Sequence, residues 1–105
     1  MTDNRPISEQ WYEAARDHAD LEAAASILEE SKSAFLSQEM SRCGDMAVSK
    51  AEMIVKASSS WKAYIDKMVS ARKEANLAKV KMEFLRMKFF EWQSAEANHR
   101  IEAKL

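Results

Sequence analysis

The stretch from Tyr64 to Trp92 reads YIDKMVSARKEANLAKVKMEFLRMKFFEW and decides the fold. Hydrophobic residues recur in it with alternating spacings of four and three, which is the spacing of a coiled coil. No Gly or Pro interrupts the chain from 60 to 104, so the pattern predicts one long helix over about 60–104, capped by a serine among 58–60. The repeating positions are Tyr64, Met68, Ala71, Ala75, Ala78, Met82, Leu85, Phe89 and Trp92.

A second long helix is predicted over about 8–42. Ser8 is its expected N-cap, and Gly44 is the expected left-handed residue after its end. Its alanine-rich middle would let another helix approach closely. The hydrophobic residues recur every seven positions, with others beside them: Ala14, Leu21, Leu28 and Phe35, flanked by Ala24, Ala25, Leu36 and Met40.

The segment between these helices contains the pattern of a capping box, SKAE, beginning at Ser49. In this motif the Ser49 hydroxyl accepts from the Glu52 backbone N–H, while the Glu52 carboxylate accepts from the Ser49 N–H. Val48 and Met53 stand where a hydrophobic staple places its two residues. We therefore expect a short helix over about 49–57.

Together these elements predict an all-α fold, a long antiparallel helical hairpin whose arms span about 8–42 and 60–104. The short helix of about 49–57 connects the arms, and the hairpin could dimerise into a bundle. Residues 1–7 are expected to be a flexible lead-in, and 8–105 a single helical domain.

The composition argues against several classes of protein. Among 105 residues there is one Gly and one Pro, too few for a fold with many tight turns, whereas three Trp, four Phe and seven Met argue against disorder throughout. No run of 18 apolar residues and no basic start followed by an apolar stretch is present, so we expect neither a membrane span nor a secretory signal. The lone Cys43 cannot form an internal disulfide, which fits a cytoplasmic protein.

No catalytic or metal-binding set of residues can be recognised. His18 and His99 lack the neighbouring Cys, His or carboxylate residues of a zinc site, and Cys43 has no His beside it in the sequence. One glycine cannot build a Gly-rich phosphate loop. We therefore expect no enzyme activity, no catalytic or metal-binding residue, no cofactor and no small-molecule substrate.

The charges are distributed unevenly along the chain. Residues 1–47 carry ten acids against four bases, and residues 48–105 carry seven acids against twelve bases. Two interpretations are open: the acidic and basic arms attract each other, or a basic face remains for an anionic partner such as nucleic acid. The candidates for that face are Lys62, Lys67, Arg72, Lys73, Lys79, Lys81, Arg86 and Lys88.

A shorter hydrophobic stripe accompanies the first on a neighbouring face of the last helix. This second stripe consists of Leu77, Val80, Phe84 and Met87. A hairpin partner covers only one stripe, so the second predicts a further protein interface, with another copy of the chain or with a helical protein partner.

Several short segments resemble small uncharacterised proteins of tailed phages and prophages, whose genes tend to lie near those for single-strand-annealing recombination. The resemblance covers about residues 20–102 and implies an early phage protein acting in the bacterial cytoplasm. It implies no catalytic residue. The segments are Gly44–Met46, Val48–Glu52, Ala75–Val80, Trp92–Ser94 and Glu96–Arg100.

Two non-enzymatic functions follow as hypotheses. One is a phage accessory protein in DNA recombination or replication that binds DNA or a DNA-bound protein. The alternative is a phage inhibitor or adaptor that binds a host defence protein, such as a nuclease or a CRISPR effector. A small structural or assembly protein is a third hypothesis, which large homo-oligomers would support.

Overall fold

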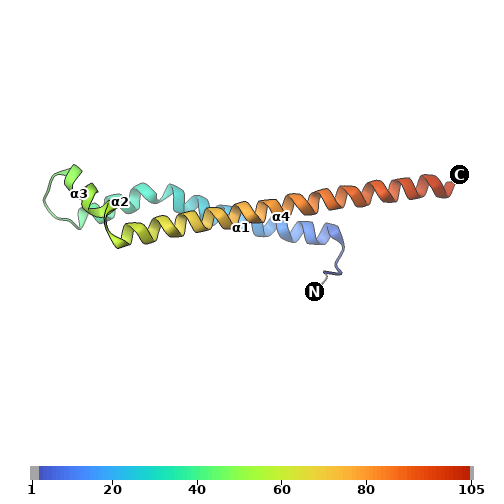
Figure 1. Ribbon diagram of the computed structural model, residues 1–105, viewed down its shortest axis with the longest axis horizontal. Helices are drawn as coiled ribbons and strands as arrows, with labels where there is room; N and C mark the ends of the chain where they lie inside the picture. The colour runs from blue at the N-terminus through green and yellow to red at the C-terminus, as the bar shows by residue number, and fades with distance from the viewer. Residues whose placement is uncertain (1–2, 105) are drawn as a thin grey trace.

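A computed structural model describes residues 3–104, so the predictions for 1, 2 and 105 lie outside the described residues. The described chain forms four helices: α1 (Ile7–Glu30), α2 (Lys32–Ser41), α3 (Val48–Lys56) and α4 (Ser59–Lys104). Figure 1 shows α1 and α4 side by side and antiparallel, with α3 at one end of the molecule. The all-α hairpin is therefore confirmed. None of the described helices combines the length and the apolar character that crossing a lipid bilayer requires.

The molecule is a rod of 83 × 25 × 15 Å. Its radius of gyration is 23.1 Å, whereas a compact domain of this length has about 13 Å. A helix of 46 residues such as α4 is about 69 Å long, and it sets the length of the rod. The C-terminal part of α4 extends past the start of α1 (Figure 1).

The predicted first stripe of α4 is buried or half-buried from Tyr64 to Phe89. Ala25 and Ala75 are fully buried, and Leu85 is also buried. Further along, the ring of Trp11 lies 5.4 Å from that of Phe89. Small alanine side chains at the centre of the contact let the two backbones approach, while aromatic rings fill the wider space nearer the ends.

Two predicted core positions are exposed. Trp92 is 53% exposed because α1 begins at Ile7, beside this tryptophan, and none of the four described helices covers the rest of it. Ala24 is exposed because its neighbour Ala25 occupies the buried position of the alanine run.

The first arm is divided at Ser31, where one continuous helix over 8–42 was expected. Ser31 has φ −84° and ψ −5°, and its N–H still donates to the Ile27 carbonyl at 2.9 Å. The Tyr64 hydroxyl donates to the Leu28 carbonyl just before this point. A side chain that bonds to a helix carbonyl is a recognised cause of local helix distortion, and we attribute the division to it.

The prediction of Ser8 as N-cap is wrong. Helix α1 begins at Ile7, its N-cap is Pro6, and none of the side chains that the structure describes caps it. The Pro6 carbonyl accepts from the N–H groups of Glu9 and Gln10, both at 3.1 Å. These backbone bonds begin the helix before the position at which Ser8 could cap it.

The capping box is also wrong. Helix α3 begins at Val48 with Ala47 as N-cap and without a side-chain cap. The Ala47 carbonyl accepts from the N–H groups of residues 50 and 51, at 3.1 and 3.0 Å, and these bonds replace the cap. The carboxylate of Glu52 instead lies 2.7 Å from the Lys56 ammonium group.

The predicted hydrophobic staple does not form either, because Val48 and Met53 are 72% and 70% exposed. Instead α3 buries Ala51 and Val55 and packs against α2 and α4. Helix α3 thus closes the end of the hairpin through the face that contains Ala51 and Val55, and not through the face of Val48 and Met53.

Two predictions of helix ends are confirmed. The Ser58 hydroxyl accepts from the Trp61 N–H at 3.2 Å and so caps α4. Gly44 follows the end of α2 with a φ of +82°, a conformation that favours glycine. In the lead-in, Arg5 donates to the carboxylates of Asp3 and Glu13, and its hydrogen bonds to Asp3 lower the pKa of that residue to about 2.

Candidate functional site

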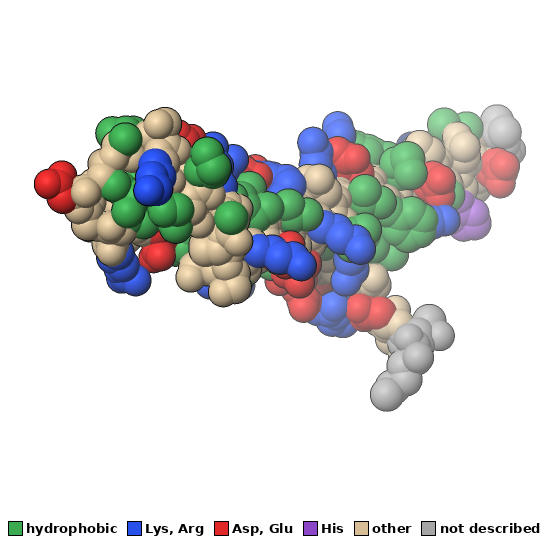
Figure 2. All heavy atoms as spheres, turned by 60° about the vertical axis from the view of Figure 1, so that its left-hand side comes forward, with side chains coloured by type: hydrophobic (Ala, Val, Ile, Leu, Met, Phe, Trp, Pro, Cys, Tyr) green, Lys and Arg blue, Asp and Glu red, His purple; other side chains and the backbone are tan. Residues whose placement is uncertain are grey.

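The second stripe is exposed on α4, with Leu77 at the edge of the contact with α1. Its members Leu77, Val80, Phe84 and Met87 are 59%, 63%, 50% and 60% exposed. Figure 2 shows, on the face turned to the viewer, hydrophobic side chains open to solvent with Lys and Arg beside them. The sequence thus located an uncovered hydrophobic surface. Contiguous exposed apolar side chains of this kind mark interaction sites in soluble proteins.

Arg72 does not belong to a free basic face. Its guanidinium donates to Glu22 at 2.6 Å and to both carboxylate oxygens of Glu29 at 2.6 and 2.9 Å. Hydrogen bonding from Arg72 favours the charged carboxylate and lowers the pKa of Glu29. The attraction between the acidic and basic arms is therefore confirmed at this position, and Arg72 is removed from the predicted partner face.

The other seven basic residues remain at the surface of α4. Lys88 lies 3.5 Å from the carboxylate of Glu91, one turn away, and both side chains are largely exposed. Such a pair adds little stability and leaves the ammonium group accessible. Among residues 3–104, no acidic partner lies within ion-pair distance of the remaining six: Lys62, Lys67, Lys73, Lys79, Lys81 and Arg86.

The hydrophobic and basic surfaces of α4 are in direct contact. The ammonium group of Lys88 lies 5.6 Å from the ring centroid of Phe84, and the guanidinium of Arg86 lies 5.6 Å from that of Phe90. At these distances the cations are attracted to the aromatic faces. A partner on this side of α4 would therefore meet hydrophobic groups and positive charges together.

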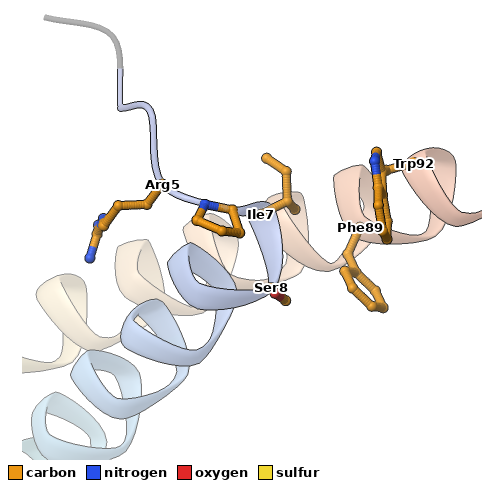
Figure 3. A pocket seen from close by; sticks show the side chains of 6 residues that line it. Arg5, Ile7, Ser8, Phe89 and Trp92 are labelled. Carbon is orange, nitrogen blue, oxygen red and sulfur yellow. The ribbon is translucent and has the colours of Figure 1, made fainter.

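A hollow at the start of α1 was not predicted from the sequence. It has a volume of about 260 Å³, and Figure 3 shows Phe89 and Trp92 of α4 on one side of it. The other lining residues are Arg5, Pro6, Ile7 and Ser8. Pro6 could have indicated this hollow, because it marks where α1 begins, and α1 does not cover α4 beyond that point.

The residues considered for catalysis or metal binding do not come together. His18 lies on α1, His99 lies on the part of α4 beyond α1, and Cys43 lies in the turn after α2, where its thiol faces the Glu39 carbonyl at 3.6 Å. Within residues 3–104, no three His, Cys, Asp or Glu side chains are grouped as metal ligands would be. The candidate functional site is therefore the surface of α4.

Comparisons of the chain with protein-family models, with curated proteins and with solved structures found no match.

Proposed function

We propose that this chain is a non-enzymatic accessory protein that binds DNA, or the acidic surface of a DNA-bound protein, through the basic side chains of α4. The observation that carries the proposal is the separation of charge between the two packed helices. Helix α1 has seven Asp and Glu residues against one Arg, whereas α4 has ten Lys and Arg against six Asp and Glu.

This arrangement would orient an anionic partner. The acidic helix repels phosphate groups, and the basic helix attracts them, so approach from the α4 side is favoured. Within residues 3–104, six basic side chains of α4 have no acidic partner, and they could release counterions from a nucleic acid, the main source of affinity in non-specific binding. The resemblance to phage proteins encoded near recombination genes would make this a phage role in the bacterial cytoplasm.

The test is a titration of single- and double-stranded oligonucleotides followed by fluorescence anisotropy. With three phosphate contacts, affinity should fall roughly fortyfold between about 50 and 200 mM NaCl. The double variant Lys79→Glu/Arg86→Glu should bind at least about tenfold more weakly than the unmodified chain. Its matched control is Lys50→Glu/Arg16→Glu, which makes the same change in net charge outside α4.

Equal loss of affinity in the two double variants would refute a site on α4. If the unmodified chain binds neither oligonucleotide at low salt, direct contact with DNA is refuted. Affinity capture from cells then tests for a DNA-bound protein: the same protein should be captured with and without nuclease treatment, accompanied by DNA only in the untreated sample.

The alternative function, an inhibitor or adaptor that binds a host defence protein such as a nuclease or CRISPR effector, is favoured by a different observation. Trp92 borders the hollow at the start of α1 and is half exposed, and Trp is enriched among the residues that dominate protein interfaces. This function predicts nuclease-resistant capture of one protein, lost in Trp92→Ala and retained in Lys79→Glu/Arg86→Glu.

A further inference from the structure

The second stripe continues at both ends into a charged residue. Lys73 lies four positions before Leu77, and Glu91 lies four positions after Met87, so the alternating spacings of four and three continue from 73 to 91. All of these residues are exposed on α4. The extended stripe is therefore an uncovered coiled-coil seam with a basic end and an acidic end.

The extended stripe is symmetric about position 82. Leu77 and Met87 lie five positions on either side of it, Val80 and Phe84 lie two positions away, and Lys73 and Glu91 lie nine positions away. An interface between two copies related by a two-fold axis requires this kind of self-complementarity. We propose that two copies of the chain pair through the second stripes of their α4 helices, antiparallel, with position 82 of one copy opposite position 82 of the other.

In this register every position of the extended stripe meets a compatible one. Leu77 faces Met87 of the second copy, and Val80 faces Phe84, so the seam is hydrophobic at its centre. Lys73 faces Glu91 at both ends, so opposite charges meet twice. A parallel pair would instead place Lys73 against Lys73 and Glu91 against Glu91, which is unfavourable.

The charges beside the seam agree with the antiparallel arrangement at its ends. Glu74 lies next to Lys88 of the second copy, and this attraction also occurs twice. Close to the two-fold axis Lys81 approaches its own copy, which is a repulsion. Glu83 also meets its own copy there, and these two repulsions are outnumbered by the four attractive pairs.

The structure leaves room for the second copy. Helix α1 covers the opposite side of α4, where Ala75 and Leu85 are buried, so pairing displaces no part of the hairpin. The dimer goes beyond the proposed function, because its formation requires neither DNA nor another protein. Its test is therefore independent of any DNA-binding result.

The first measurement is sedimentation of the full chain up to high micromolar concentration, where we expect a dimer. Phe84→Glu should raise the dissociation constant of the dimer at least about tenfold, because two buried aromatic side chains are lost from each interface. Ile27→Glu is the matched control, since Ile27 is 62% exposed on α1, and it should leave the dimer intact. Circular dichroism should show unchanged helix content in both variants.

Disulfide crosslinking tests the register. In a Cys43→Ser background, Lys73→Cys combined with Glu91→Cys should yield covalent dimers on mild oxidation. Lys73→Cys alone should not, because positions 73 of the two copies would be about 27 Å apart along the seam, and a disulfide needs the two Cα atoms within about 7 Å. A monomer at every concentration, equal dimerisation of Phe84→Glu, or crosslinking of Lys73→Cys alone would each overturn the proposal.

Discussion

Replacement of Ala25 by leucine tests how closely the two long helices are packed. Ala25 of α1 has no exposed surface, and Ala75 of α4 is also fully buried, in a hairpin in which these two helices pack against each other. Leucine adds three carbon atoms at a position where there is no free space. The helices must then separate or the side chain must adopt a strained rotamer, and overpacking of this kind costs about 1–3 kcal/mol.

The control for this substitution is the neighbouring residue. Ala24→Leu makes the same chemical change in the same helix, but Ala24 is exposed, so its effect should stay within about 0.5 kcal/mol. For a chain of this size each kcal/mol lowers the melting temperature by about 4–8 °C, which predicts a fall of about 4–24 °C for Ala25→Leu. Both variants must be compared at the same protein concentration, because self-association would make the melting temperature depend on it.

The assay is urea denaturation followed by far-ultraviolet circular dichroism. We expect the midpoint of Ala25→Leu to fall while the slope of the transition is unchanged, since the substitution alters packing and not the surface exposed on unfolding. If Ala25→Leu were as stable as Ala24→Leu, the close approach of α1 to α4 would be refuted.

Three further predictions use the same assay. Ser58→Ala should destabilise the chain by about 1 kcal/mol because it removes the cap of α4. Ser49→Ala should have little effect, because none of the described side chains caps α3. A larger loss of stability in Ser49→Ala than in Ser58→Ala would show that the capping box does form. Gly44→Ala should cost about 1–2 kcal/mol through backbone strain alone, since apart from its two chain neighbours no atom of residues 3–104 lies within 4 Å of an added Cβ, and Gly44→Asn should cost less. Arg72→Ala should destabilise the chain at neutral pH, and the difference in stability from the unmodified chain should shrink in high salt and as the pH falls below the ordinary carboxyl pKa. The reason is that the lowered pKa of Glu29 contributes stability only while that carboxylate is charged. A stability difference that stays constant with pH would refute this prediction.

The helix spans and the uncovered stripe could be predicted from the sequence because both depend on short-range spacing. An uninterrupted run without Gly or Pro forms a helix from bonds between residues four apart, and a repeat of four and three places the second stripe on one side of it. The position of α4 and the exposure of Val80 and Phe84 follow from these local rules. The function of the exposed surface does not, because spacing alone carries no information about the partner.

The tertiary structure decided which of several locally equivalent residues is buried, begins a helix or forms an ion pair. Among the three consecutive alanines ending at Ala25, only the contact with α4 selects one for burial. Ser49 and Ala47 both offer a start for α3, and a cap worth about 1 kcal/mol was outweighed by additional backbone bonds. Arg72 has the same local surroundings as the other bases, yet only this residue lies opposite Glu22 and Glu29 across the hairpin, a pairing that depends on residues more than 40 positions apart.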